Sequence, residues 1–169
     1  METALVLLVP EAEAIVSSWR ARYDTSAAEG VPAHITVLVP FMAYEKIDAA
    51  CRNTLREIIA GCGALNLTFL ASKRFPDTIW LAPEPDEPIR KLSQALVAQF
   101  PDYPLYGGAF DVIVPHLTVA QGEAAVLDEV EADLSARLTT PLKARIESCT
   151  LFSHEPGRWR DMEQFRLGS

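Results

Sequence analysis

Two segments of the chain share the pattern His-x-Thr-Val. The first reads Pro-Ala-His-Ile-Thr-Val and contains His34 and Thr36. The second reads Pro-His-Leu-Thr-Val and contains His116 and Thr118. In an extended strand, residues i and i+2 point to the same face, so each histidine projects beside its threonine while the apolar residue between them points the other way. Each copy therefore predicts a strand with one polar, reactive face and one core face.

An imidazole beside a hydroxyl suits the cleavage of a phosphodiester. Imidazole titrates near neutral pH, so one ring can accept a proton from the nucleophile while a second ring donates one to the leaving oxygen. A threonine hydroxyl can donate to a non-bridging phosphate oxygen, where negative charge grows in the transition state. In-line displacement needs one proton-transfer group on each side of phosphorus. Two facing copies of the motif would meet that need.

The two motifs lie about half a chain apart and are followed by similar elements. Amphipathic helices are predicted at residues 45–60 and 124–138, and each is followed by strands of a predicted hairpin. We therefore expect an α+β, bilobal fold, in which two pseudo-twofold-related lobes of sheet and helix surround a central cleft. No linker composition separates the halves, so residues 1–169 are predicted to form one compact domain with one H-x-T strand from each lobe.

Apolar spacing predicts the remaining elements. Residues 3–9 form a continuous apolar run of strand length, and a helix is expected after Pro10. A further helix is predicted at residues 86–100. Strands are predicted at residues 34–39, 65–75, 78–82, 110–114, 116–120, 142–152 and 158–167. Loops are expected at residues 23–33 and 101–108.

The charge balance limits the kind of partner. The chain has 15 Lys and Arg against 23 Asp and Glu, for a formal net charge of −8 at pH 7. Proteins that hold long nucleic acids usually present a basic surface. The composition therefore argues against extended RNA or DNA and leaves a small nucleotide or an RNA-end phosphodiester as the expected substrate. No apolar run is long enough to span a bilayer, so we expect no membrane partner, and we expect a monomer.

The metal-ligating residue types show no ligand-like spacing. Cys51, Cys62 and Cys149 are odd in number and lack a C-x-x-C pair, which argues against a disulfide framework or a structural zinc site. No Asp or Glu stands at tight ligand spacing from His34 or His116. No metal or other cofactor is expected. Free thiols and the lack of a basic, signal-like start favour a cytoplasmic protein.

The same residues resemble a known family. The two H-x-T-V elements, the first continuing to Phe41 as HITVLVPF, resemble those of the two-histidine (2H) phosphoesterase superfamily. The nearer likeness is to its 2′-5′ RNA ligase/RNA cyclic phosphodiesterase branch. The segment RFPDTIWLAP at residues 74–83 and the closing W…FRLG at residues 159–168 add to it. The resemblance covers essentially the whole chain.

The resemblance implies a metal-independent hydrolase of cyclic or linear phosphodiesters at a ribose 2′ or 3′ oxygen. It makes His34 and His116 the catalytic pair and Thr36 and Thr118 the phosphate-binding residues. It also implies that His116 is the base for water and His34 the acid. Ligase-like members often continue the second motif with a basic residue, where this chain has Gln121. That departure favours a 2′,3′-cyclic or similar nucleotide phosphate over RNA ends.

Three further residues are predicted to bind substrate. Phe41 and Trp159 could stack on a base, as aromatic faces do for single nucleotides. Arg74, at the end of a predicted strand, could attract phosphate. One alternative function uses the same cleft, namely a non-catalytic module that binds a nucleotide or phosphate without turnover. The enzyme is favoured because a binding module has no need of two proton-transfer groups.

Overall fold

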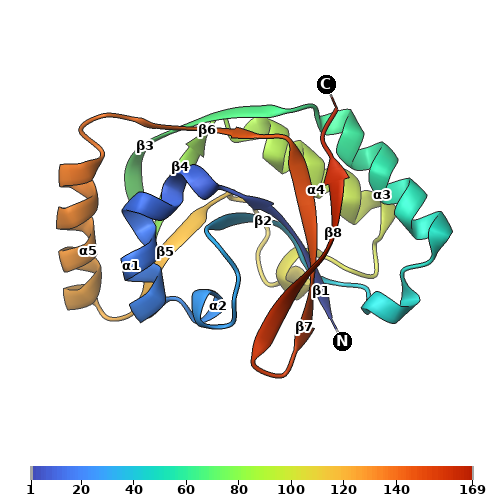
Figure 1. Ribbon diagram of the computed structural model, residues 1–169, viewed down its shortest axis with the longest axis horizontal. Coiled ribbons are helices and arrows are strands. Elements are labelled where there is room, and N and C mark those ends of the chain that lie inside the picture. The colour runs from blue at the N-terminus through green and yellow to red at the C-terminus, as the bar shows by residue number, and fades with distance from the viewer. Residues whose placement is uncertain (1, 169) are drawn as a thin grey trace.

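The structure is a computed structural model that describes residues 2–168, and its strands form two four-stranded antiparallel sheets (Figure 1). Sheet A has the order β2-β1-β7-β8, with bounds His34–Phe41, Thr3–Leu8, Ser148–Glu155 and Arg158–Arg166. Sheet B has the order β5-β4-β3-β6, with bounds Leu117–Gln121, Thr78–Glu84, Leu65–Phe75 and Leu142–Ile146. The expected α+β fold with one sheet in each lobe is confirmed.

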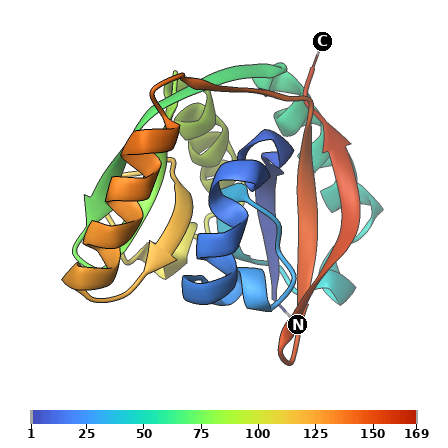
Figure 2. The same ribbon diagram turned by 60° about the vertical axis from the view of Figure 1, so that its left-hand side comes forward.

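Helices cover one side of each sheet (Figure 2). Their bounds are α1 Glu13–Tyr23, α2 Thr25–Ala28, α3 Ala49–Cys62, α4 Glu87–Gln99 and α5 Ala124–Arg137. Short 3₁₀ turns lie at Pro10–Ala12, Tyr44–Lys46 and Leu105–Gly108. Local chemistry sets where the helices begin: the Asp48 carboxylate accepts a hydrogen bond from the Cys51 N–H at the start of α3, and Pro88 lies in the first turn of α4. No helix in the described part of the chain is long and apolar enough to cross a membrane.

The two sheets repeat one arrangement. In each sheet, the strand that carries the threonine of a histidine motif is an edge strand. It pairs antiparallel with the strand that comes before it in the chain, from which a helix separates it: β1–α1–β2 in sheet A and β4–α4–β5 in sheet B. The connecting helices are exchanged between the lobes, because α1 packs against β5 while α4 packs against β2 (Figure 1). The lobes are therefore related by a pseudo-twofold arrangement in which each supports the other's histidine strand.

Hydrogen bonds fasten the exchanged helices. The buried hydroxyl of Ser93 in α4 donates to the carbonyl of Val37 in β2 at 2.7 Å. On the other side, the indole N–H of Trp19 in α1 donates to Asp133 in α5, also at 2.7 Å. Because these bonds join elements from opposite halves of the chain, they limit movement of one histidine strand relative to the other.

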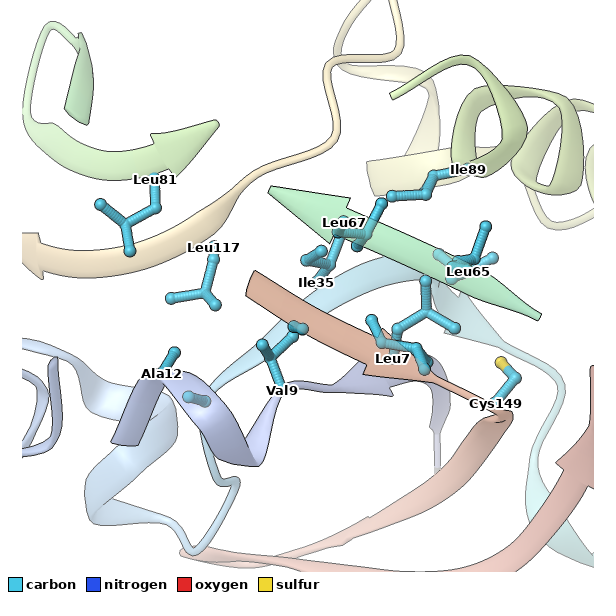
Figure 3. Close-up of a cluster of buried hydrophobic side chains, with 14 of the residues drawn as sticks. Leu7, Val9, Ala12, Ile35, Leu65, Leu67, Leu81, Ile89, Leu117 and Cys149 are labelled. Atoms are coloured by element: carbon cyan, nitrogen blue, oxygen red, sulfur yellow. The ribbon is translucent and has the colours of Figure 1, made fainter. Parts of the chain in front are cut away.

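One hydrophobic cluster contains residues from both sheets (Figure 3). Ile35 and Leu117, which directly follow the two histidines in the chain, are fully buried in it. Leu7 of β1 and Leu81 of β4 belong to the same cluster. Because side chains alternate along a strand, burying Ile35 and Leu117 turns the neighbouring histidines and threonines to the opposite face of each sheet.

Two strand predictions are wrong. Residues 142–152 were expected to form one strand but form parts of two, since β6 ends at Ile146 in sheet B and β7 begins at Ser148 in sheet A. The alternation of apolar residues is similar on both sides of Glu147, and this pattern does not indicate which sheet a residue joins. Residues 110–114 are irregular rather than extended, and Phe110 and Val112 are 69% and 72% exposed.

Candidate functional site

His34 is the first residue of β2, and the segment before it is held by buried charges. Arg20 of α1 lies behind this segment, with its Nε donating to the Asp24 carboxylate at 3.0 Å and its Nη2 donating to the Val31 carbonyl at 2.9 Å. The Ala33 N–H donates to the Glu13 carboxylate at 2.6 Å. These bonds determine where the chain enters β2, and therefore where His34 lies.

His116 lies immediately before β5 and is surrounded by aromatic rings. Its ring centroid is 5.2 Å from that of Phe75 and 5.8 Å from that of Trp80, both in edge-on arrangements. The Tyr106 ring stacks on it at 6.4 Å. Thr118, two residues on, is opposite Trp80 in the β4–β5 register. The two histidines therefore have different surroundings, with a buried guanidinium near His34 and an aromatic shell around His116.

Both imidazoles are oriented by the same backbone contact. His34 Nδ1 lies 2.8 Å from the Pro32 carbonyl oxygen, and His116 Nδ1 lies 2.7 Å from the Val114 carbonyl oxygen. In each case the carbonyl belongs to the residue two positions earlier. A carbonyl can only accept, so Nδ1 carries the proton in the neutral ring and Nε2 keeps its lone pair. Each ring thus leaves Nε2 to exchange a proton with a ligand.

The fold brings the two motifs together. Strands β2 and β5 are in contact, although each is an edge strand of a different sheet. The two histidines are close enough for the charge of His116 to lower the pKa of His34. Thr36 and Thr118 are half-buried on the same strand faces as their histidines, while Ile35 and its counterpart in β5 are buried. The result is a site with two imidazoles and two hydroxyls, one of each from either lobe.

Burial lowers the pKa of both histidines, because a charged imidazolium loses hydration in the site. For His34 the pKa falls from 6.5 to about 4; the hydrogen bond to Pro32 raises it, and the positive charge of Arg20 lowers it further. For His116 burial also lowers the pKa, and the hydrogen bond to Val114 raises it. Both rings are therefore neutral at pH 7 in the ligand-free protein.

Tyr106 is a site residue that the sequence analysis missed. It comes from the loop between α4 and β5, where it has a positive φ of 52°. Its phenol is hydrogen-bonded with Thr36 of one motif while its ring stacks on His116 of the other. Burial raises the pKa of this phenol, so it is a neutral hydrogen-bonding group at pH 7. No spacing rule marks a tyrosine in a loop, and its contacts exist only because the loop folds over β2.

The three other predicted substrate-binding residues lie in different surroundings. Phe41 is 2% exposed and packs edge-on against Phe100 and Tyr103, so the structure places it in the core and corrects its predicted contact with substrate. Its position at the end of β2 turns it to the buried face. This leaves no face of its ring open to a base.

Arg74 is occupied by acidic side chains. Its guanidinium forms ion pairs with Asp128 at 2.7 Å and with Glu131 at 2.5 Å, both on α5. The predicted role in attracting phosphate is therefore not supported by this structure, because two carboxylates already neutralise the charge. The acidic face of α5 was visible in the sequence, but its position beside β3 was not.

Trp159 lies on the same side of sheet A as His34. It is the second residue of β8, its backbone N–H donates to the Glu29 carbonyl at 2.8 Å, and it lines a cavity of about 690 Å³ together with Leu8 and Pro32. Leu8 is opposite His34 in the β1–β2 register. The cavity therefore adjoins the first motif, and the predicted contact of Trp159 with substrate stays a prediction that this position allows.

Metal ligands do not gather at the site. Within residues 2–168, no group of three or more His, Cys, Asp or Glu side chains is arranged to hold a metal ion. The chemistry that the described residues offer is proton transfer by two imidazoles and hydrogen bonding by hydroxyl groups.

Comparison with known proteins identifies the family. A sequence profile of the 2′-5′ RNA ligase superfamily matches residues 8–158, which include both histidine motifs. The chain belongs to the 2′-5′ RNA ligase superfamily. The resemblance to the 2H phosphoesterases that the two motifs indicated is thereby confirmed.

Known proteins are similar to this chain along nearly their full length. A Bacillus pumilus protein named as an inferred phosphoesterase is 30% identical over 161 residues, covering 91% of this chain and 90% of the relative. The crystal structure of TT0787 from Thermus thermophilus has a TM-score of 0.63, with 17% identity and all of both chains covered. E. coli LigT, solved in complex with 3′-AMP, has a TM-score of 0.59 with 18% identity over 99% of this chain and 98% of its own. The two crystal structures support the fold, and the family profile supports a phosphoesterase- or ligase-type protein.

Proposed function

We propose that this chain is a metal-independent phosphodiesterase that hydrolyses a cyclic nucleotide phosphate, 2′,3′-cyclic or similar, or a small RNA-end phosphodiester. The observation that carries the proposal is the matched pair of imidazoles on adjacent edge strands. Each has Nδ1 held by a backbone carbonyl, so each leaves Nε2 free to exchange a proton, and the strands β2 and β5 are in contact. A binding module would need neither free nitrogen.

The proposed reaction transfers two protons and breaks one P–O bond. A neutral imidazole accepts a proton from water as the water oxygen bonds to phosphorus. A protonated imidazole on the other side donates its proton to the leaving ribose oxygen as that P–O bond breaks. The product is a phosphate monoester with a free hydroxyl, and the two rings have exchanged protonation states. Thr36 and Thr118 donate to the non-bridging oxygens, where charge accumulates.

The surroundings of the rings favour a particular order of acid and base. When only one of the two rings carries a proton, the ring with the lower pKa is the neutral one and is available to accept a proton from water. Burial together with Arg20 gives His34 a pKa of about 4. His116 has no neighbouring cation among the causes of its lowered pKa. We therefore assign His34 as the base for water and His116 as the acid, the reverse of the order that the family resemblance implies.

Complexes of related proteins agree with a nucleotide-sized substrate. E. coli LigT has been solved with 3′-AMP and, in another structure, with NADP+. Both are small molecules that contain a nucleoside and phosphate. These complexes support a small nucleotide as the substrate of this chain, in line with its acidic composition.

The decisive experiment measures turnover of 2′,3′-cyclic nucleotides in excess chelator. His34→Ala and His116→Ala should each lower kcat by about 10²–10⁴, the usual contribution of one general acid or base. His154→Ala is the matched control, because this third histidine contacts Glu29 and lies in neither motif. It should keep activity within a few-fold of the unmodified protein.

Other outcomes identify other functions. Nucleotide binding without turnover in the unmodified protein would support the binding module. Loss of activity in chelator that added metal restores would contradict the metal-independent mechanism. Equal activity of all three histidine variants would contradict paired acid–base catalysis.

A further inference from the structure

A second cavity lies next to the segment that leads into His116, because Val114 and Pro115 belong to its lining. It has a volume of about 410 Å³ and is lined by residues of β3, β4, α4 and the segment before β5. We call it the sheet B cavity, and its lining includes Lys73, Trp80, Glu84, Arg90, Val114 and Pro115. The Val114 carbonyl that orients His116 belongs to this lining. The cavity therefore begins directly beside the proposed acid.

Two hydrogen-bond donors in this lining have no partner. Among residues 2–168, three buried side-chain nitrogen or oxygen atoms lack a hydrogen bond, and two of them, Trp80 Nε1 and Arg90 Nε, belong to residues of the sheet B cavity. Trp80 is only 5% exposed. A buried donor without an acceptor costs about 1–3 kcal/mol, so such atoms are few in native proteins. Two of them in one lining indicate that an acceptor-bearing ligand completes the site.

A flexible side chain lies next to Trp80 in this lining. Lys73 is opposite Trp80 in the β3–β4 register, and its side chain is exposed without an ion pair in the described part of the chain. A long, unbranched lysine side chain changes rotamer at little cost when solvent is available. Its displacement would let a ligand approach Trp80 Nε1 and would leave the ammonium group at the mouth of the cavity.

The charges of the lining distinguish a base from a second phosphate. Lys73 and Arg90 are the lining cations, whereas three lining carboxylates belong to Glu84, Asp86 and Glu87. Because Asp86 pairs with Arg90 and Glu87 pairs with Lys91, Glu84 and Lys73 remain, and a phosphate would meet no net positive charge in this cavity. A neutral heterocycle with acceptors on one part of its edge and N–H donors on another matches donors and carboxylates together.

We propose that the sheet B cavity binds the nucleobase of the substrate, an inference that rests on the proposed phosphodiesterase function. Trp80 Nε1 and Arg90 Nε donate to ring-nitrogen or carbonyl acceptors of the base. The exposed Glu84 carboxylate accepts from an amino or imino N–H. Binding the base in the sheet B cavity orients the ester between the two imidazoles and contributes to the rate by positioning.

The test compares two substrates that differ only in the base. One is a nucleoside 2′,3′-cyclic phosphate, and the other is methyl riboside 2,3-cyclic phosphate, which has the same ring phosphate and a methoxy group in place of the base. Trp80→Phe removes the indole N–H and keeps an aromatic ring beside His116. Arg90→Met removes the other donor, and Arg22→Met in α1 is its control because Arg22 is exposed and does not line this cavity.

The unmodified protein should show a higher kcat/KM for the nucleotide than for the methyl riboside. Each of Trp80→Phe and Arg90→Met should reduce this ratio about 3- to 10-fold, as expected for loss of one hydrogen bond. Arg22→Met should leave the ratio unchanged. Any disturbance of His116 by the Trp80 substitution affects both substrates and cancels in the ratio.

Equal kcat/KM values for the two substrates in the unmodified protein would overturn the base site, and so would variants that leave the ratio intact. Turnover of neither substrate would instead contradict the proposed function. In that case, calorimetry can compare the affinity for a nucleoside 3′-monophosphate with the affinity for methyl riboside phosphate. This comparison tests the base site independently of turnover. Weaker binding of the nucleotide in Trp80→Phe supports the site, and unchanged binding overturns it.

Discussion

At the scale of single residues, the two histidines share one hydrogen-bond pattern but differ in their electrostatic surroundings. A carbonyl two residues earlier fixes the tautomer of both rings, which follows from the local backbone of the repeated motif. The nearby Arg20 and the aromatic rings around His116 break the symmetry. A pair of otherwise similar imidazoles can in this way be given different affinities for a proton.

This difference predicts the pH dependence of the proposed reaction. The active form of the free enzyme has one neutral and one protonated ring, and both pKa values are below 6.5, with that of His34 at about 4. The acid ring therefore loses its proton at a lower pH than a solvent-exposed histidine would. The bell-shaped profile of kcat/KM should have its maximum below pH 6.5. Steady-state rates between pH 3.5 and 9 test this expectation.

The profile of kcat should lie at higher pH than that of kcat/KM. A bound phosphodiester is an anion, and its charge raises the pKa of both rings in the complex. A maximum of kcat/KM at pH 7 or above, or a profile independent of pH, would contradict the lowered pKa values or the paired mechanism.

At the scale of elements, the segment between α1 and β2 is the part that the sequence described least well. Residues 23–33 were expected to be a loop, but they contain α2, and the Asp24 carboxylate accepts from the Ser26 N–H at its start. Arg20 and Asp24 form an ion pair at 3.0 Å with side chains only 3% and 6% exposed. A buried pair of this kind holds the segment that leads into His34.

Arg20→Met should therefore destabilise the protein more than a surface change. Removing one partner leaves the Asp24 carboxylate buried without a counter-charge, which typically lowers the free energy of unfolding by about 3–5 kcal/mol. Arg22→Met on the same helix is the control, because Arg22 is exposed and should change stability by less than about 1 kcal/mol. Urea unfolding followed by circular dichroism measures both. Similar small effects of the two substitutions would show that the pair does not hold this segment.

At the scale of the whole molecule, the exchanged helices and the shared core join the two lobes. Leu7 of sheet A and Leu81 of sheet B lie in one hydrophobic cluster, and α4 is hydrogen-bonded to β2 of the other lobe. We propose that the chain unfolds as one cooperative unit, as predicted for a single domain. Neither sheet can lose its structure without exposing apolar surface of the other.

Two tryptophans allow this proposal to be tested in each lobe. Trp80 lies in β4 of sheet B and Trp159 in β8 of sheet A. A variant that keeps Trp80 as its only tryptophan and one that keeps only Trp159 should each unfold in urea at the same midpoint by fluorescence and by far-ultraviolet circular dichroism. Leu117→Ala, in the shared cluster, should lower both midpoints together, through a loss of about 2–5 kcal/mol. A fluorescence midpoint that departs from the circular dichroism midpoint would show that one lobe unfolds alone.

The amino-acid sequence by itself determined the repeated motif, the helices that follow it and the division of each strand into a reactive face and a core face. These features depend on the order of residues along one element, and side-chain periodicity expresses that order directly. The family resemblance followed from the same residues. Predictions at this level, such as the burial of Ile35 next to His34, agree with the structure.

Only the tertiary structure decided which side chains meet across elements. It placed Tyr106 between the two motifs, paired Arg74 with α5 and buried Phe41 in the core. It also brought Arg20 near His34 and two unpartnered donors to the sheet B cavity. These contacts join residues far apart in the chain, and their existence depends on how helices and sheets pack, which no local pattern of residue types records.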